Sequence, residues 1–252
     1  MSRESLSGKT ALVTGGAVRL GRATARALSA EGAGVVIHYS RSEAAAAELA
    51  NELASTGGKA WTLRADFETA DDTASLIPRA QELAGRLDVL VNNASIFAAG
   101  RLAEVTWGEV ARNMHVNAWA PFSLSRSFAE HVGQGSIVNF LDTRLRGYDW
   151  NHVAYIVSKH ALELLTRMMA LEFAPDIRVN AVAPGLILPP PGKDESYLQE
   201  MKHTVPLNRH GEAEDVAAAV MFLLLSVYVT GQVIYVDGGR HLLEQASGPN
   251  PR

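Results

Sequence analysis

Short apolar runs alternate with longer amphipathic segments along the whole chain. Seven of the runs have the length and composition of buried strands: Thr10–Val13, Val35–Tyr39, Ala60–Arg64, Val89–Val91, Ser136–Phe140, Val179–Val182 and Val233–Val236. Six longer segments between them show helical patterns: Leu20–Glu31, Ser42–Ala54, Asp72–Ala84, Thr106–Glu130, Val153–Phe173 and Ala213–Leu225. Strands that alternate with helices predict a parallel sheet covered by helices on both faces.

This alternation runs through the chain without an internal repeat or a linker that would divide domains. We therefore expect one domain over residues 1–252, with short flexible ends at about 1–8 and 244–252. The stretch LPPPG, Leu188–Gly192, predicts a surface loop, because proline cannot continue a strand.

Composition narrows the class of protein. The chain has 252 residues, is 47% hydrophobic and carries a net charge of -4 with both signs scattered, so it has no electrostatic footprint for nucleic acid. It has no cysteine, which excludes disulfides, thiol catalysis and cysteine-based metal sites, and we expect no metal. The longest apolar run, Val216–Leu225, is too short to cross a bilayer. We expect a soluble cytoplasmic protein with no membrane partner.

A glycine-rich turn, TGGAVRLG (Thr14–Gly21), follows the first predicted strand and opens the first predicted helix. In this position such a turn favours binding of a dinucleotide. Gly15 and Gly16 let a ligand approach the backbone, and Gly21 lets the helix pack closely. Arg19 occupies the place where the second glycine of such a turn usually falls.

The end of the second strand indicates which dinucleotide is bound. The chain reads HYSRS, His38–Ser42, with no carboxylate before Glu43, and an acidic residue here would favour NAD. Arg41 offers a charged fork to a 2′-phosphate and Ser42 begins the next helix, so we predict NADPH. The alternative is a solvated Arg41 and an N-cap at Ser42. Asp66 could accept a hydrogen bond from the adenine amino group or cap a helix.

Tyr155 and Lys159 lie four residues apart on a helical pattern and therefore share one face. An ammonium near a phenol favours the phenolate, so we expect a lowered pKa for Tyr155 and transfer of its proton to a substrate. Such a pair also occurs by chance in many helices, so the spacing alone is weak evidence.

Five motifs appear in order: TGGAVRLG, NNAS (Asn92–Ser95), Asn117 in a helix, YIVSK (Tyr155–Lys159) and PG (Pro184–Gly185). In this order and spacing the chain resembles the short-chain dehydrogenase/reductase family from about residue 9 to residue 243. The resemblance implies a single-domain, doubly wound Rossmann-type α/β fold with a seven-stranded parallel sheet. It also implies a homotetramer, formed through the predicted helix Thr106–Glu130 and the helix that bears Tyr155.

The resemblance also implies roles for single residues. Tyr155 would donate the proton, Lys159 would hold the nicotinamide ribose, and Asn117 would support a water relay. Asn93 would contact the adenosine side, and Pro184 to Ile187 would border the nicotinamide. The predicted cofactor-binding residues are Gly15, Arg19, Leu20, His38, Tyr39, Arg41, Ser42, Asp66, Asn93, Ala94, Ser95, Tyr155, Lys159, Pro184, Gly185 and Ile187.

Two residues depart from the usual family pattern. Asp142 stands where most members carry a serine thirteen residues before the tyrosine, and Arg19 replaces a glycine. Both departures, with HYSRS and NNASIF, are similar to one branch, the pteridine and dihydromonapterin reductases. In that branch the arginine reaches the cofactor phosphate and the pterin, the aspartate assists proton delivery, and an aromatic residue matching Phe97 stacks on the pterin. The predicted substrate-binding residues are Arg19, Ser95, Phe97, Asp142, Tyr155 and Leu186.

The chemistry of a pterin gives a reason for both departures. Reduction of a C=N bond ends with a protonated nitrogen, which an acid pair of Asp142 and Tyr155 suits better than a serine hydroxyl does. Arg19 and Phe97 would supply charge and a stacking surface for a flat polar heterocycle. Plain core packing is the alternative for Phe97, and shaping of the turn is the alternative for Ser95.

The leading hypothesis is an NADPH-dependent reductase of dihydropterins or dihydrofolate, in which the segment 186–197 lies over the substrate. One alternative is a general carbonyl reductase, for 3-oxoacyl thioesters or sugars, in which Asp142 has no special role. Another is an NADPH-binding regulator without chemistry, since folds outlive functions. The intact set of Tyr155, Lys159 and Asn117 argues against the regulator.

Overall fold

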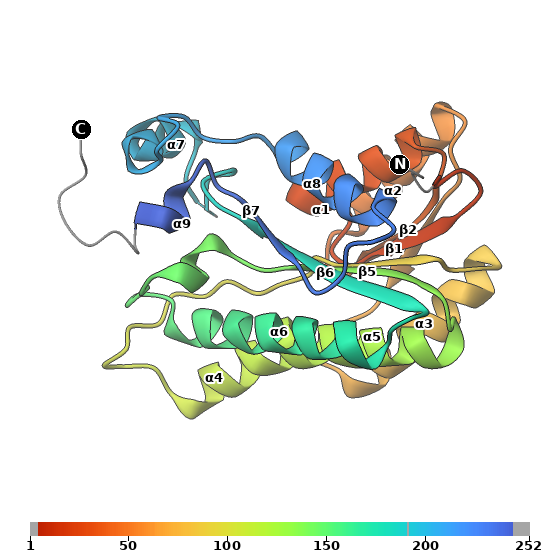
Figure 1. The fold of residues 1–252 in the computed structure, drawn as a ribbon, viewed down its shortest axis with the longest axis horizontal. Helices are drawn as coiled ribbons and strands as arrows, with labels where there is room; N and C mark the ends of the chain where they lie inside the picture. The colour runs from red at the N-terminus through yellow and green to blue at the C-terminus, as the bar shows by residue number, and fades with distance from the viewer. Residues whose placement is uncertain (1–4, 191, 244–252) are drawn as a thin grey trace.

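A parallel sheet of seven strands forms the centre of the computed structural model, which describes residues 5–190 and 192–243 (Figure 1). The strands are β1 (Thr10–Val13), β2 (Gly34–Tyr39), β3 (Ala60–Arg64), β4 (Val89–Asn92), β5 (Gly135–Phe140), β6 (Ile177–Pro184) and β7 (Val233–Val236). Their spatial order is β3-β2-β1-β4-β5-β6-β7. The chain therefore reverses its direction of travel between β1 and β4, which is the point where doubly wound folds bind ligands.

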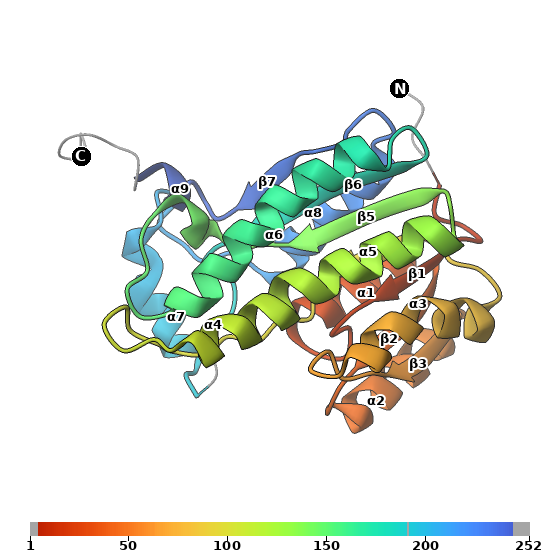
Figure 2. The same ribbon diagram turned by 90° about the horizontal axis from the view of Figure 1, so that it is seen from below.

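Helices cover both faces of the sheet (Figures 1 and 2). One face carries α1 (Arg19–Ala30), α2 (Glu43–Ser55) and α8 (Ala213–Leu225). The other carries α3 (Ala70–Ala84), α4 (Trp107–Met114), α5 (Ala120–His131) and α6 (Val153–Glu172). The predicted doubly wound fold with seven parallel strands is confirmed.

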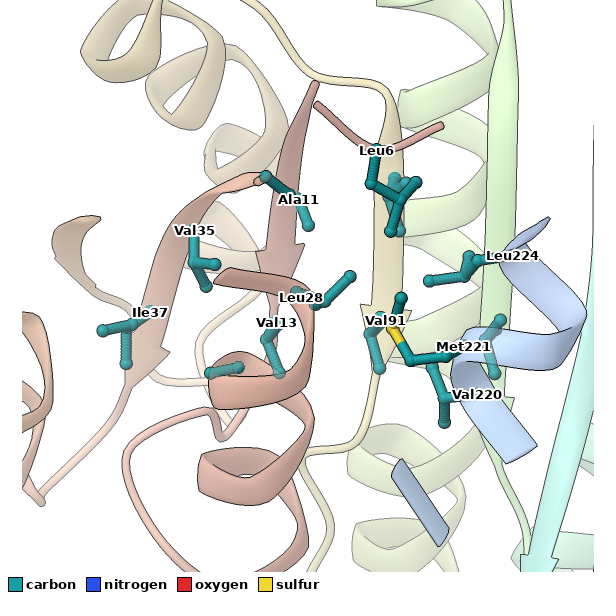
Figure 3. Packing of buried hydrophobic residues seen from close by; sticks show 14 of the residues in the cluster. Leu6, Ala11, Val13, Leu28, Val35, Ile37, Val91, Val220, Met221 and Leu224 are labelled. Carbon is teal, nitrogen blue, oxygen red and sulfur yellow. The ribbon is translucent and has the colours of Figure 1, made fainter. Parts of the chain in front are cut away.

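The core follows from the strand sequences, because strands that are buried on both faces are apolar at every position. Val13 and Ile37 belong to the same buried cluster as Leu28 of α1 and Val220 of α8 (Figure 3). Leu6 is only 2% exposed and packs into the same cluster, so this part of the expected flexible N-terminal end is packed. Residues 1–4 and 244–252, the rest of the expected flexible ends, lie outside the described residues.

The predicted helix Thr106–Glu130 consists of three pieces. The capping box of Thr106 and Glu109 starts α4, and a π-helical turn, His115–Trp119, separates α4 from α5. Such single π turns inside helices often occur at functional sites. Asn117 lies in this turn.

Short helices at the carboxyl end of the sheet were not predicted. They are the 3₁₀ helix η2 (Thr143–Arg146), α7 (Glu195–Met201), the 3₁₀ helix Lys202–Thr204 and α9 (Arg240–Leu243). Each is too short to show a clear amphipathic period. In the predicted loop Leu188–Gly192, residues 188–190 and 192 are irregular, and residue 191 lies outside the described residues. Among the helices that the structure describes, none has the length and apolar character needed to cross a membrane.

Candidate active site

A cavity of about 620 Å³ opens beyond the carboxyl ends of the strands around the β1–β4 switch point. Every predicted site residue except Asn117 lines it. The predicted residues that it brings together are Gly15, Arg19, Leu20, His38, Tyr39, Arg41, Ser42, Asp66, Asn93, Ala94, Ser95, Phe97, Asp142, Tyr155, Lys159, Pro184, Gly185, Leu186 and Ile187. The sheet topology thus gathers segments from most of the chain at one place.

The glycine turn presents bare backbone to the cavity. Gly15 has a φ of +60°, a conformation that favours glycine, and a Cβ added to Gly21 would lie 2.2 Å from the carbonyl oxygen of Gly15. The Nδ2 group of Asn93 donates hydrogen bonds to the carbonyl oxygens of Thr14 (2.9 Å) and Gly15 (3.0 Å) and so fixes the turn. A fixed turn of bare backbone that leads into a helix N-terminus fits the phosphates of a dinucleotide.

Arg19 is the first residue of α1 and has a φ of +53°, an unusual value for a residue other than glycine. Its Nη2 group donates a hydrogen bond to the carbonyl oxygen of Pro189 at 2.8 Å. Arg19 therefore adopts a backbone conformation that favours glycine, and its side chain reaches across to the segment after β6.

His38 lies beneath the glycine turn and is 2% exposed. Its Nδ1 accepts the Gly15 N–H at 3.0 Å, so Nε2 carries the proton and donates to the Ala65 carbonyl at 3.1 Å. Burial lowers the pKa of His38 to about 4, and its ring stacks on Phe67 with centroids 4.6 Å apart. His38 therefore supports the turn as a neutral imidazole, and both of its ring nitrogens are already used.

The far end of the cavity carries the groups expected near adenosine. Arg41 is exposed and has no hydrogen bond or ion pair within the described chain, and Ser42 precedes α2 without a capping bond from its hydroxyl. The Asp66 carboxylate accepts the Glu68 N–H at 3.1 Å and does not cap α3, whose N-cap residue is Thr69. Arg41 and Ser42 thus keep their donors available for a ligand.

The opposite end of the cavity contains the acid pair. The Tyr155 hydroxyl donates a hydrogen bond to Asp142 Oδ2 at 3.0 Å. The other carboxylate oxygen, Oδ1, accepts the Arg144 N–H at 2.8 Å and caps the 3₁₀ helix η2. Asp142 follows β5 and Tyr155 lies in the first turn of α6, so the fold brings together two residues thirteen positions apart.

The expected lowering of the Tyr155 pKa is wrong for this arrangement. Burial raises the pKa of Tyr155 well above 10, and the negative charge of Asp142 adds to the increase. The Lys159 ammonium lies 5.7 Å from the centre of the Tyr155 ring and donates a hydrogen bond to the Phe140 carbonyl at 2.7 Å. Desolvation and a neighbouring carboxylate therefore outweigh the ammonium, and Tyr155 is held as a protonated phenol.

Lys159 is itself buried, and burial lowers its pKa to about 8. We expect Lys159→Met to stabilise the protein by about 2 kcal/mol at pH 7 while it removes activity. Removing the desolvated charge gains roughly 3 kcal/mol, and losing the bond to Phe140 costs about 1 kcal/mol. In the unfolded chain the Lys159 amine stays protonated up to its ordinary pKa of 10.5, whereas in the folded protein it loses the proton near pH 8. The gain in stability of the variant is therefore full below pH 8 and fades as pH rises toward 10.5, because the folded parent no longer buries a charge.

Urea unfolding of both proteins at pH 7 and at pH 9.5 measures the effect of Lys159→Met. A variant that is less stable than the parent at pH 7, or a difference that grows at the higher pH, would contradict the assignment of a costly buried ammonium.

Phe97 forms a wall beside the acid pair. Its ring meets the Tyr155 ring edge-on with centroids 4.8 Å apart, and the His152 ring stacks on it at 4.2 Å. The Arg144 guanidinium lies 5.0 Å from the centre of the Phe97 ring. Phe97 is 36% exposed and lines the cavity, so it is not the plain core residue of the alternative interpretation.

Asn117 lies outside the cavity wall and is fully buried. Its Oδ1 accepts the Ile96 N–H (2.8 Å) and the Ser95 hydroxyl (3.1 Å), and its Nδ2 donates to the Ile96 carbonyl (3.0 Å) and to Ser158 Oγ (3.1 Å). Asn117 therefore holds the Ser95–Ile96 segment, and a water relay through it stays a prediction. Ser95 has a similar role in shaping this turn, although it also lines the cavity.

Several charged residues of the cavity were not predicted. Arg112 and Glu68 form an ion pair of 2.6 Å at the adenosine end, and Arg144 and Arg240 line the opposite end. The only signal for the last two is position, since both follow shortly after a strand whose carboxyl end faces the cavity. Nothing in their spacing distinguishes them from solvated surface arginines.

Comparison with known proteins places this site in a family. A family model described as enoyl-(acyl carrier protein) reductase matches residues 16–241. The chain belongs to the short-chain dehydrogenase/reductase family. The pteridine reductase 1 of Leishmania tarentolae is 38% identical, over 92% of this chain and 96% of its own.

Other relatives carry different names. A protein of Streptomyces violaceoruber, assigned to a granaticin polyketide synthase as a ketoacyl reductase, is 36% identical over 96% of this chain and all of its own. The crystal structure of FolM alternative dihydrofolate reductase 1 from Brucella canis, complexed with NADP, has a TM-score of 0.90 and 32% identity. It covers 98% of this chain and 97% of its own.

These comparisons confirm the resemblance to the family and the prediction of an oxidoreductase. The family uses nicotinamide cofactors, and the Brucella structure holds NADP, the form of cofactor that the sequence predicts here. The names of these relatives refer to more than one class of substrate, a pteridine or dihydrofolate in two of them and a ketoacyl group in the third.

Proposed function

We propose that the protein is an NADPH-dependent pteridine reductase that reduces the C=N bond of dihydropterins or dihydrofolate. The observation that carries the proposal is the hydrogen bond of 3.0 Å from the Tyr155 hydroxyl to the Asp142 carboxylate. This acid pair lies in the same cavity as the aromatic wall of Phe97 and the free backbone of the glycine turn. The relatives named for pteridine and dihydrofolate reduction support the same substrate class.

The residues present fit the cofactor. The glycine turn fits the phosphates, Arg41 has free donors for a 2′-phosphate, and Gly185 and Ile187 border the opposite end of the cavity. When bound, NADPH supplies a hydride to the carbon of the C=N bond, and the π electron pair of that bond moves to the nitrogen. The protein then has to deliver one proton to that nitrogen.

Tyr155 and Asp142 are arranged to deliver this proton. The raised pKa of Tyr155, caused by burial and by the Asp142 charge, keeps the phenol protonated until the nitrogen becomes basic. Asp142 accepts the hydrogen bond of the Tyr155 hydroxyl and so holds the direction of that hydroxyl. A serine in place of Asp142 would steady an oxyanion but would add no acid to the pair.

Consumption of NADPH with a panel of substrates tests the proposal. The panel contains dihydrobiopterin, dihydromonapterin, dihydrofolate, a 3-oxoacyl thioester and a sugar ketone. We expect turnover with the pterins or the folate and little with the ketones. Turnover of ketones alone would favour a carbonyl reductase, which the Streptomyces relative supports. Calorimetric binding of NADPH without any turnover would favour a regulator.

Arg41→Ala is expected to weaken NADPH binding about 30-fold and to leave NADH binding almost unchanged. The guanidinium would form a charge-assisted contact only with the 2′-phosphate, and such contacts contribute roughly 2 kcal/mol. Calorimetric titration of the parent and the variant with both cofactors measures the difference. Equal losses with NADPH and NADH would contradict a contact specific to the phosphate.

We also propose that the protein acts in the cytoplasm as a homotetramer that contacts neither nucleic acid nor membrane. The apolar residues Leu164, Met168 and Leu171, exposed along α6, support an interface on this helix. The family resemblance implies the same helix and the pair α4–α5.

A further inference from the structure

Two arginines at the substrate end of the cavity have no part in the chemistry proposed above. Arg144 comes from the 3₁₀ helix η2 and Arg240 is the first residue of α9, and both line the cavity. The two helices pack beside each other at the carboxyl end of the sheet. Hydride addition and protonation of a C=N bond need no further cation at this end, so the two guanidinium groups call for another explanation.

The Arg144 guanidinium is held in place but keeps its donors. It lies 5.0 Å from the centre of the Phe97 ring, and its Nη1 is 3.4 Å from Asp149 Oδ2. The Asp149 carboxylate makes its shorter contacts elsewhere, to the Asn151 N–H at 2.9 Å and to His152 Nδ1 at 2.8 Å. Within the described chain the Arg144 guanidinium makes no hydrogen bond, so it can still donate two parallel bonds to a ligand.

Arg240 is fixed by its backbone, and among the described residues its side chain has no hydrogen bond or ion pair. Its N–H donates to the Asp237 carbonyl at 3.2 Å. The nearby Asp237 carboxylate is used by Thr143, by the Gly239 N–H and by His241. Over residues 5–190 and 192–243, no carboxylate pairs with the Arg240 guanidinium.

We propose that Arg144 and Arg240 form an anion subsite for the side chain of the substrate, so that the enzyme prefers dihydropterins that carry a carboxylate or a phosphate. This inference rests on the proposed function. A guanidinium matches the geometry of both anions and pairs with them more strongly than with neutral groups. With the ring beside Phe97 and the acid pair, the side chain of a pterin would extend toward η2 and α9.

Steady-state kinetics with three substrates test the subsite. Dihydrobiopterin is neutral, dihydrofolate carries carboxylates, and dihydroneopterin phosphate carries a phosphate. We expect at least one anionic substrate to have a kcat/KM about a hundredfold above that of dihydrobiopterin at low salt, the effect of two charge-assisted contacts. Arg240→Met and Arg144→Met should each reduce this preference by about tenfold, the effect of one charge-assisted contact. Added salt should reduce the preference in the parent protein.

The ratio of anionic to neutral substrate is the readout, because a general loss of activity or of fold would affect both substrates alike. Arg126→Met on α5, outside the cavity, is the matched control and should leave the ratio unchanged. The substrate whose preference falls in both variants identifies the anion as carboxylate or phosphate. Pterin turnover with equal kcat/KM for neutral and anionic substrates, or a preference that both variants keep, overturns the anion subsite alone. Absence of turnover with every pterin and folate overturns the proposed function and the subsite with it.

Discussion

Replacement of Tyr155 by phenylalanine is expected to lower kcat for dihydropterin reduction by about a thousandfold. The variant removes the only hydroxyl that the structure places against Asp142 Oδ2 among the described residues, and with it the proton held beside the site of reduction. The ring itself stays, so the edge-on contact with Phe97 and the shape of the cavity are kept. The loss should therefore fall on the chemical step and leave binding intact.

Single-turnover mixing of the NADPH-loaded proteins with dihydrobiopterin measures this step. Calorimetric binding of NADPH should be the same for the parent and for Tyr155→Phe. The raised pKa of Tyr155 adds a further expectation, because burial and the Asp142 charge keep the phenol protonated through pH 9. The rate of the parent should therefore not fall through loss of the phenol proton between pH 6 and pH 9. A variant that retains a tenth or more of the parent rate would remove Tyr155 from the proton path.

The fold was predictable because its five inner strands are buried on both faces and its helices on one. Such burial leaves continuous apolar runs such as Val35–Tyr39 and helical periods such as that of Val153–Phe173. The π-helical turn at Asn117 was not predictable, since it changes the hydrogen bonding inside a continuous helical pattern. The short helices η2, α7 and α9 have too few residues for a period to appear.

The site was predictable where the motif fixes the place of a residue on the sheet. Gly15, Asp142 and Tyr155 follow or face strand ends, so the topology alone brings them together. The sequence could not show how nearby charges and burial combine to set the pKa of one side chain. The Lys159 ammonium was expected to lower the Tyr155 pKa, but desolvation and the adjacent carboxylate raise it.

The pairing of polar groups was equally hidden from the sequence. His38 was predicted to contact the cofactor, and the structure uses both of its ring nitrogens for backbone groups. Arg144 and Arg240 resemble surface arginines in the sequence, and only the packing of η2 against α9 brings them to one cavity. Residues whose roles depend on which partner they find are therefore the ones that motifs miss.

Asp142→Ser should lower kcat/KM for dihydropterins by about a hundredfold, and it tests the feature that separates the two candidate reductases. Serine caps helices about as well as aspartate does, so the capping bond to the Arg144 N–H can persist while the carboxylate is lost. The same change at Asp194, which caps α7 by accepting the Ser196 N–H, is the matched control for the effect on stability, since it removes a capping carboxylate without touching the acid pair.

Measurements of the Asp142→Ser variant with a pterin and with a 3-oxoacyl thioester distinguish the two mechanisms. If the carboxylate serves protonation of a ring nitrogen, the pterin rate falls, because the hydroxyl cannot take part in the acid pair. The thioester rate should stay low, since the cavity keeps the wall of Phe97 that suits a flat ring. A variant that gains ketone reduction from an already high level, while pterins stay unreactive in both proteins, would show that Asp142 replaces serine without changing the substrate. The parent and the variant share Tyr155, Lys159 and the cofactor end of the cavity. Any difference between their rates therefore comes from the exchange of the Asp142 carboxylate for a hydroxyl.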